Sequence, residues 1–239
     1  MRILAFETSA KAVSAALVED GNLIGEYYQN SGQTHSRTLM QLAEDLLRNC
    51  DLTSADVDAV ACAAGPGSFT GVRIGAAAAK GFAWGREVPC FGVSTLEAMV
   101  RAAAWADGIY CAAMDARRSQ VYTALFSVEA GTMTRVTEDA ALSLEELGTR
   151  LQAQNGPKFL VGDGAALCYN TLGNDMPDLR LLPEHLRQQR AAGAALLAWD
   201  RLCAGEHPSG RDLTPNYLRL SQAERERQER LHTLPEKEV

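Results

Sequence analysis

The chain has 239 residues, a net charge of −7 and 46% hydrophobic residues, enough apolar material for one large domain or two small ones. The acidic balance argues against a protein that wraps nucleic acid by itself, because phosphate binding needs clustered Lys and Arg side chains, but nucleic acid reached through a partner is not excluded. The cysteines are irregularly spaced and form no C-x-x-C pair, which predicts a reduced protein without disulfides or structural zinc. The sequence shows no signal-peptide layout and no apolar run of membrane length, so a cytoplasmic protein is expected.

The first hundred residues predict three antiparallel strands followed by alternating helices and strands. An Asp-Gly pair at Asp20-Gly21 predicts the turn between the second strand and the third. Thr34 or Ser36 is expected to cap the first helix, and Ser94 or Thr95 the third. The predicted elements are strands at Arg2–Phe6, Ala12–Asp20 and Asn22–Gln29, a helix at Thr34–Asn49, a strand at Val57–Ala64, a helix at Thr70–Trp84, a strand at Pro89–Val93 and a helix from Ser94.

This order of elements matches the ribonuclease-H-like fold, and its opening recurs in the second half of the chain. The segment Phe6–Leu17 aligns with Met114–Leu125 at a constant offset, which places Glu7 on Asp115 and predicts a second copy of the fold. Lobes are therefore expected at 1–107 and 108–220, followed by a charged tail at 221–239. The second lobe is expected to contain a strand at Met133–Thr137, a helix at Leu142–Gln154, a strand at Lys158–Gly164, a short helix from Ala165 and a long helix at Leu186–Ala204.

A glycine-rich loop, "AAGPGSFTG", precedes the second helix. It lacks the lysine of a P-loop, and Thr70 occupies the third glycine position of the dinucleotide-binding fingerprint. Its backbone amides at a helix N-terminus can still attract an anion, which makes Glu7, Ser68 and Thr70 possible nucleotide or anion contacts. The alternative is a sharp turn after which Ser68 or Thr70 caps the helix. The sequence leaves both interpretations open.

The second helix itself carries small residues at three- and four-residue spacings, which allow another helix to approach closely. Glycine inside a helix costs about 1 kcal/mol relative to alanine, so close packing is expected to offset this cost at Gly75 and Gly81. The partner is the chain's own first helix, another chain, or both. The stripe consists of Gly71, Gly75, Ala78, Ala79 and Phe82.

Five motifs spaced through residues 2 to 219 together resemble the bacterial TsaB (YeaZ) family: "ILAFETS", "GPGSFTGVRIGAAAAKGFAW", "GVSTLEAM", "DARRSQVY" and "PNYLR". The resemblance implies an α/β fold with the actin/Hsp70-like (ASKHA) architecture, in which two tandem ribonuclease-H-like lobes have mixed sheets flanked by helices. It also implies a non-catalytic role in forming N6-threonylcarbamoyladenosine at position 37 of tRNAs that read ANN codons.

The same resemblance implies the partners. Family members bind and activate the catalytic paralogue TsaD, act with the ATPase TsaE through the complex, form homodimers alone, and meet tRNA only indirectly. Family pairing uses the first two helices, which correspond here to Thr34–Asn49 and Thr70–Trp84. The interface is therefore expected to include His35, Leu39, Leu42, Leu46, Gly71, Arg73, Ile74, Gly75, Ala78 and Phe82.

The chain departs from the catalytic paralogue at the metal site. That paralogue has an H-x-x-x-H pair on its first helix, whereas His35 is followed four residues later by Leu39. One histidine does not hold a catalytic metal alone, so no metal, cofactor or catalytic residue is expected. Glu7 stands where actin-like ATPases carry an aspartate, and its simpler interpretation is a turn residue that accepts backbone amides.

Two further interpretations stay open. The turn Asp115–Arg118, "DARR", either clamps a phosphate or a partner's carboxylate, or closes on itself through an ion pair between Asp115 and one arginine. The alternative function is a nucleotide-dependent, actin-like ATPase or kinase. A peptidase is disfavoured, because the four histidines lack the spacing of a metal site.

Overall fold

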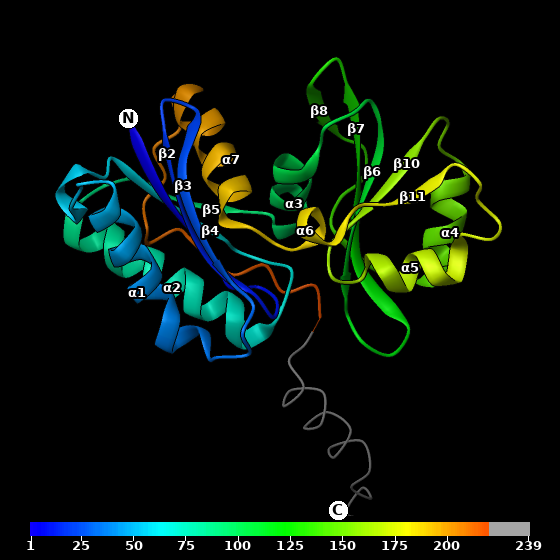
Figure 1. Cartoon of the computed structure of the whole chain (residues 1–239), viewed down its shortest axis with the longest axis horizontal. Coiled ribbons are helices and arrows are strands. Elements are labelled where there is room, and N and C mark those ends of the chain that lie inside the picture. Colours follow the sequence, from blue (N-terminus) through cyan, green and yellow to red (C-terminus); the bar gives the residue numbers. More distant parts are fainter. Residues whose placement is uncertain (220–239) are drawn as a thin grey trace, which may run out of the picture.

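The computed structural model describes residues 1–219, so the predicted charged tail at 221–239 lies outside the described residues. Two lobes stand side by side, each built on a mixed β-sheet with helices on both faces (Figure 1). This arrangement confirms the predicted two-lobed, ribonuclease-H-like fold. Within residues 1–219, no helix combines the length and the hydrophobicity needed to cross a membrane.

The N-terminal lobe is built on a five-stranded sheet with the order β3-β2-β1-β4-β5. The first three strands form the predicted antiparallel meander, while β4 and β5 add to it in parallel. Asp20 and Gly21 turn the chain with φ angles of 49° and 78°, as an Asp-Gly hairpin requires. The strands are β1 (Arg2–Glu7), β2 (Val13–Glu19), β3 (Asn22–Gln29), β4 (Ala59–Ala63) and β5 (Cys90–Val93).

The C-terminal lobe has a six-stranded sheet with the order β11-β10-β6-β7-β8, and β9 pairs with β7. The sequence patterns did not predict β9 or β11, which have four and three residues and are too short to show an alternating pattern. The strands are β6 (Gly108–Asp115), β7 (Gln120–Glu129), β8 (Thr132–Arg135), β9 (Ala140–Ser143), β10 (Lys158–Val161) and β11 (Leu179–Leu181).

The two hairpins that open the lobes correspond to each other, with a shift of one residue in the second strand. Glu7 pairs with Ser14 across the first hairpin, and Asp115 pairs with Val121 across the second. The constant offset of the sequence alignment matches Val13 with Val121, but in the structure the residue equivalent to Val121 is Ser14. The turn of the second hairpin is therefore one residue shorter, and the two acidic residues still end equivalent strands.

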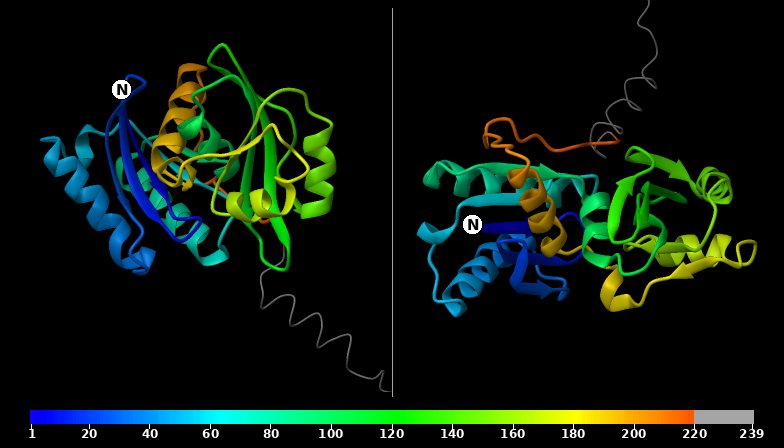
Figure 2. Two further views of the ribbon diagram at one scale, coloured as in Figure 1. Left: turned by 45° about the vertical axis from the view of Figure 1, so that its right-hand side comes forward. Right: turned by 90° about the horizontal axis from the view of Figure 1, so that it is seen from above.

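The helices form three layers around the two sheets (Figures 1 and 2). One pair covers the outer face of each sheet, and α3 and α7 lie between the sheets. Ser68 and Ser94 cap α2 and α3 through their side chains, as predicted, whereas Thr34 precedes α1 without such a bond. The helices are α1 (His35–Asn49), α2 (Phe69–Arg86), α3 (Thr95–Ala103), α4 (Leu144–Gln152), α5 (Ala165–Leu172), α6 (Glu184–Arg187) and α7 (Ala191–Cys203), with a 3₁₀ turn at Ser54–Asp56.

The central helices are exchanged between the lobes. Leu96 and Met99 of α3 belong to the first half of the chain but pack in the core of the second sheet. In return, Ala194 and Ala198 of α7 pack in the core of the first sheet. The boundary near residue 107 thus separates the two sheets, while one helix from each half crosses it. This exchange ties the lobes together.

The predicted long helix at Leu186–Ala204 is wrong, because the chain is extended between α6 and α7. Gln189 is fully buried there and its side-chain amide donates to Asp163 Oδ1 at 2.9 Å. Arg190 forms an ion pair with Glu26 at 2.8 Å. An extended backbone lets both polar side chains reach partners that a continuous helix would have turned away from them.

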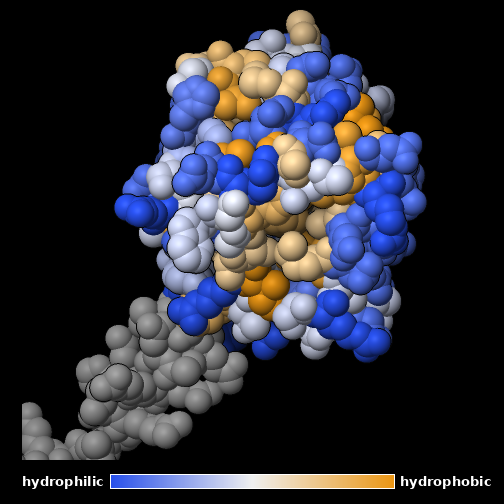
Figure 3. Space-filling view, turned by 90° about the vertical axis from the view of Figure 1, so that its left-hand side faces the viewer, coloured by the Kyte–Doolittle hydropathy of each residue, from blue (hydrophilic) through white to orange (hydrophobic). Residues whose placement is uncertain are grey.

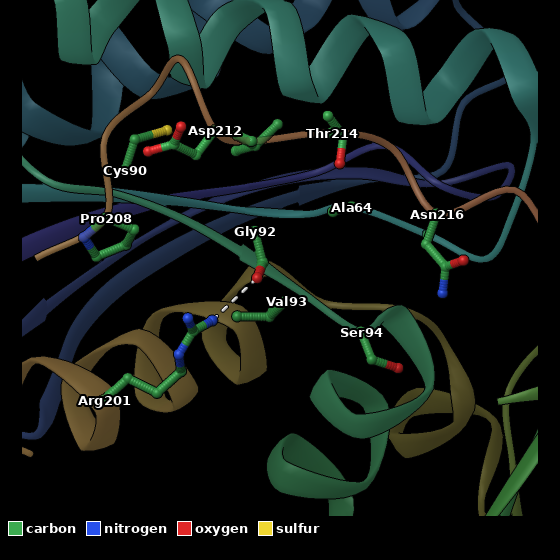
Figure 4. A pocket seen from close by; sticks show the side chains of 12 residues that line it. Ala64, Cys90, Gly92, Val93, Ser94, Arg201, Pro208, Asp212, Thr214 and Asn216 are labelled. Carbon is green, nitrogen blue, oxygen red and sulfur yellow. Dashed lines mark hydrogen bonds between the residues drawn. The ribbon is translucent and has the colours of Figure 1, made fainter. Parts of the chain in front are cut away.

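After α7 the chain returns along the N-terminal lobe as residues 206–219, here called the strap. The strap runs beside β5, where the Cys90 N–H donates to the Pro208 carbonyl at 2.9 Å (Figure 4). Further along, the Asn216 N–H donates to the Ala64 carbonyl at 2.7 Å. The Arg219 guanidinium then donates to the Ala116 carbonyl of the other lobe at 2.9 Å. The strap therefore links the glycine loop to the C-terminal lobe.

The contact between α3 and α7 gives a test of the exchanged fold. At Gly193 an added Cβ would overlap the carbonyl oxygen of Ala98, which belongs to the backbone and cannot move aside. Gly193→Ala is expected to lower the free energy of unfolding by about 1–3 kcal/mol despite alanine's better helix propensity. Urea unfolding followed by circular dichroism measures the change, and a stabilised Gly193→Ala protein would contradict the helix exchange.

Candidate functional site

Three acidic residues stand at strand ends where the two lobes face each other, and Asp163 interacts electrostatically with the other two. Glu7 ends β1, Asp115 ends β6 and Asp163 follows β10, so each lies at or just after the carboxyl end of a core strand. Glu7 is buried, and its Oε1 accepts the Ser9 backbone N–H at 2.5 Å. Its Oε2 makes no hydrogen bond within residues 1–219. Glu7 thus accepts a backbone amide of its own turn, as the simpler interpretation predicted.

Burial governs the charge of this cluster. Desolvation raises the pKa of Glu7 to about 7, and the nearby Asp163 carboxylate adds to the rise. Burial also raises the pKa of Asp163, although the amide of Gln189 opposes the shift by donating to it. The cluster can therefore hold a proton near neutral pH. No group of three metal-ligating side chains converges anywhere in residues 1–219.

The remaining polar candidates bond locally. The Nε2 atom of His35 lies 3.2 Å from the Lys11 carbonyl oxygen, which is a backbone contact. At the "DARR" turn, the Arg117 N–H donates to Asp115 Oδ1 at 2.7 Å. Within the described chain, neither Arg117 nor Arg118 forms an ion pair with Asp115. The turn closes through a backbone amide instead of a charge pair.

The glycine loop uses its polar groups within the chain. The Ser68 N–H donates to the Ser9 carbonyl at 2.6 Å, and the Ser68 hydroxyl accepts the Gly71 N–H at 3.3 Å. A Cβ on Gly67 would lie 2.6 Å from the same Ser9 carbonyl oxygen. These contacts occupy two of the amides proposed to bind an anion, and they favour the interpretation of the loop as a packed turn that begins a helix.

Gly71 and Gly75, two of the glycines predicted at an interface, face the chain's own core. At Gly71 a Cβ would overlap the Thr8 carbonyl oxygen, and at Gly75 it would lie 2.5 Å from Thr8 Oγ1. Both glycines are buried. On α1, Leu39 and Leu46 are also buried, in the core of the N-terminal lobe. These four residues therefore pack within the N-terminal lobe of their own chain.

The opposite side of α2 is exposed and apolar. Gly81 and Gly85 face open space, where an added Cβ would meet no atom within 4 Å. Trp84, between them, is 84% exposed. On a helical wheel these exposed positions lie opposite the buried ones. The stripe of small residues did not reveal this from the sequence, because it does not show which side of the helix faces the core. We call this surface the outer α2 face: Arg73, Ile74, Ala77, Ala78, Gly81, Trp84 and Gly85.

An apolar groove lies next to this face. It has a volume of about 670 Å³ and runs between α1 and the following loop, with Phe82 of α2 in its wall. Met40, half exposed, lines it from α1. Figure 3 shows apolar surface bordered by polar side chains on this side of the molecule. Of the residues expected at the interface, Leu42, Ile74, Ala78 and Phe82 are partly buried against the core, and Arg73 is exposed.

The Glu7 pKa leads to a prediction about pH. The pKa of the buried Glu7 carboxyl is raised from 4.5 to about 7. Below pH 4.5 the carboxyl is protonated in both the folded and the unfolded chain, so it does not lower the free energy of unfolding; above pH 7 it is charged in both, and the free energy of unfolding is lowered by the full amount. The penalty is about 3 kcal/mol at 1.36 kcal/mol per pKa unit. Relative to Glu7→Gln, the wild-type protein should lose roughly this stability between pH 5 and 8 in urea unfolding. Parallel pH profiles for the two proteins would contradict this account of Glu7.

Comparisons of the sequence and the fold with known proteins identify the family of the chain. A family model described as "TsaD: tRNA N6-adenosine threonylcarbamoyltransferase" matches residues 27–224. The TsaB protein of Bacillus subtilis, described as a "tRNA threonylcarbamoyladenosine biosynthesis protein", is 32% identical over 94% of this chain and 96% of its own. The Escherichia coli TsaB protein is 36% identical over 69% of this chain and 72% of its own.

A solved structure described as YeaZ from Pseudomonas aeruginosa superposes with a TM-score of 0.73 and 26% identity, covering 91% of this chain and 99% of its own. A component of 2-hydroxyglutaryl-CoA dehydratase from Acidaminococcus fermentans shares the fold, with a TM-score of 0.53 and 13% identity over 85% of this chain and 99% of its own. With relatives that match nearly its whole length and a family model that spans most of it, the chain belongs to the TsaB (YeaZ) family.

Proposed function

We propose that the chain is a non-catalytic scaffold subunit in the synthesis of N6-threonylcarbamoyladenosine at position 37 of tRNAs that read ANN codons. It binds and activates a TsaD-type catalytic subunit in the cytoplasm, acts with TsaE through the complex, forms a homodimer alone, and meets tRNA only indirectly. Support comes from the names of the relatives, which place them in this biosynthesis. The TsaD-type family model adds that the chain resembles the catalytic subunit it is proposed to bind.

The observation that carries the proposal is the outer α2 face. Gly81 and Gly85 each cost about 1 kcal/mol relative to alanine in a helix, and no contact within residues 1–219 requires the missing Cβ. The exposed Trp84 adds apolar surface that is normally buried. A helix from another chain that packs closely here offsets both costs, because small residues let two backbones approach.

The polar residues of the chain support a binding role over a chemical one. His35 has a leucine at the position where a second ligand is needed, and its ring contacts a backbone carbonyl. The only glycine-loop side chain with a hydrogen bond to α2, Ser68, serves as its cap. His35 and Ser68, which resemble parts of a metal-binding and a phosphate-binding motif, thus both contact the backbone of their own chain.

A second candidate function, a nucleotide-dependent ATPase or kinase, is favoured by one observation. Glu7 and Asp163 stand at strand ends of opposite lobes, the Asp163 carboxylate acts electrostatically on Glu7, and the pKa of each is raised by burial. An ATP titration of the isolated chain, followed by a phosphate-release assay, separates the two functions. The scaffold proposal expects neither tight binding nor turnover, while the second function requires both.

Two glycine variants of α2 test the interface. Gly81→Ala should raise the free energy of unfolding by about 0.5–1 kcal/mol, because the new Cβ meets open space and alanine favours helix, yet it should weaken association. Gly81→Glu should abolish association without unfolding the protein. Gly75→Leu is unsuitable as an interface probe, because its side chain collides with Thr8.

Urea unfolding and analytical ultracentrifugation, alone and with the purified catalytic relative, measure both effects. Gln152→Glu, at an exposed position of α4 in the other lobe, is the control for placing a charge on the surface. Wild-type association of Gly81→Glu would remove the outer α2 face from the proposal.

The function itself is tested by reconstitution. Purified TsaD, TsaE, threonylcarbamoyl-adenylate and tRNA are combined with and without this chain, and modified adenosine is quantified. The proposal expects product only when the chain is present, and Gly81→Glu should reduce it to the level without the chain. Equal product in both reactions would contradict the proposed function.

A further inference from the structure

Strand β5 forms one of the two edges of the N-terminal sheet, and only one side of it is paired, with β4. The Ala64 N–H, at the end of β4, donates to the Val93 carbonyl at 2.8 Å. The backbone groups of a strand alternate between its two sides, residue by residue. Cys90 and Gly92 therefore direct their N–H and carbonyl groups away from β4, toward the open edge of the sheet.

The chain itself caps the two outer groups of this edge. The Cys90 N–H donates to the Pro208 carbonyl of the strap at 2.9 Å, and the Arg201 guanidinium donates to the Gly92 carbonyl at 3.0 Å (Figure 4). The Cys90 carbonyl and the Gly92 N–H lie between these caps, and within residues 1–219 neither has a hydrogen-bond partner. One acceptor and one donor thus stay open on an edge strand, which is a template for another chain.

A pocket adjoins these two open groups. It has a volume of about 310 Å³, at the lower end of the range for ligand pockets. Figure 4 shows Thr214 and Asn216 extending into it from the strap, with Arg201 entering from α7 on the other side of β5. The edge of β5 therefore has room beside it for a short stretch of another chain.

The two open groups determine the direction of a strand that adds here. In a parallel pair, one residue of the added strand bonds to the residues before and after the one it is aligned with. A residue aligned with Phe91 therefore donates to the Cys90 carbonyl and accepts from the Gly92 N–H. An antiparallel strand would instead exchange both of its bonds with Gly92, whose carbonyl already accepts from Arg201. The open pair fits a parallel segment.

The charges that line the pocket favour a cation. Arg201 is neutralised by Glu206, with 2.7 Å between its guanidinium and the carboxylate. Asp212 also lines the pocket, and no cationic group lies within 4 Å of its carboxylate in the part of the chain that the structure describes. A lysine or arginine of an added segment would complete this pair.

The alternation of side chains indicates where that cation stands. Phe91 packs in the core that contains α7, on one face of the sheet, whereas Cys90 packs with Leu213 of the strap on the other face. Aligned residues of neighbouring strands share a face. The residues on either side of the one aligned with Phe91 therefore face the strap, where Asp212 precedes Leu213.

We propose that an extended segment of a partner protein adds to β5 as a parallel strand, through the Cys90 carbonyl and the Gly92 N–H, with a lysine or arginine of the segment facing Asp212. The strap and Arg201 limit the added strand to a short stretch, because they occupy the groups on either side. The site contains no residue of the outer α2 face, so it goes beyond the proposed function and does not depend on it.

A methylated peptide tests the strand pairing. The probe is the pentapeptide Ser-Lys-Val-Thr-Ser, with fluorescein at its N-terminus and an amide at its C-terminus, and its valine is to align with Phe91. N-methylation of the valine removes the N–H that donates to Cys90, so binding measured by fluorescence anisotropy should weaken about tenfold. N-methylation of the threonine is the matched control, because that N–H points away from β5, and it should change binding less than about twofold.

Equal weakening by the two methylated peptides would overturn the strand pairing. The absence of binding by the unmodified peptide at about 1 mM would overturn the site itself.

The contact with Asp212 has its own test. Asp212→Asn should weaken binding of the peptide about threefold, the size expected for an exposed ion pair. It should have no effect on a peptide with glutamine in place of the lysine. Glu145→Gln, which removes an exposed carboxylate from α4 of the other lobe, is the control and should leave binding unchanged. Equal effects of Asp212→Asn on the two peptides would show that the lysine does not meet this carboxylate.

Hydrogen exchange measured by NMR locates the bound peptide. In the free chain, the Gly92 amide should exchange faster than the Val93 amide, which faces β4. Saturating peptide should slow exchange at Gly92 at least about tenfold and leave the amides of the outer α2 face unchanged. Binding of the peptide without slower exchange at Gly92 would place it elsewhere and overturn the proposal.

Discussion

The structure depends on the close approach of α2 to the turn after β1. The Thr8 hydroxyl donates to the Gly71 carbonyl at 2.8 Å, and the missing side chains of Gly71 and Gly75 leave room for this contact. The Ser9 carbonyl accepts the Ser68 N–H, so the turn also receives the loop that begins the helix. With its inner side seated on backbone, α2 has one fixed orientation, and that orientation leaves its apolar opposite side exposed.

The polar groups of the same turn are used for packing and for hydrogen bonds within the chain. Its carboxylate, Glu7, is buried between the lobes and accepts a neighbouring amide, while Ser68 is used as a helix cap. The strap then anchors the loop from the other side through Asn216 and reaches α2 through Tyr217. These polar groups of the turn, the loop and the strap thus make hydrogen bonds within the chain itself. What remains exposed on α2 is its outer face, which the proposed function assigns to a helix of another chain.

The sequence predicted the order of elements in the N-terminal lobe and named Ser68 as one of two possible caps of α2, because strong periodicity and turn residues encode both. It failed where distant contacts decide the backbone, as at the extended segment around Gln189, whose partner Asp163 is 26 positions away. It also did not separate the glycines of α2 that face the core from those that face open space. A helical wheel shows that Gly75 and Gly81 differ in direction, but only the fold shows which of them meets Thr8.

Hydrogen–deuterium exchange of the chain, with and without the purified catalytic relative, tests the central claim that the chain acts through the outer α2 face. The account predicts slower exchange of amides in residues 73–86 in the complex, and no change around Glu7 and Asp163 between the lobes. It also predicts that ATP added to the isolated chain slows neither region. Protection between the lobes by ATP alone, with α2 exchanging at the same rate in the complex, would contradict the account.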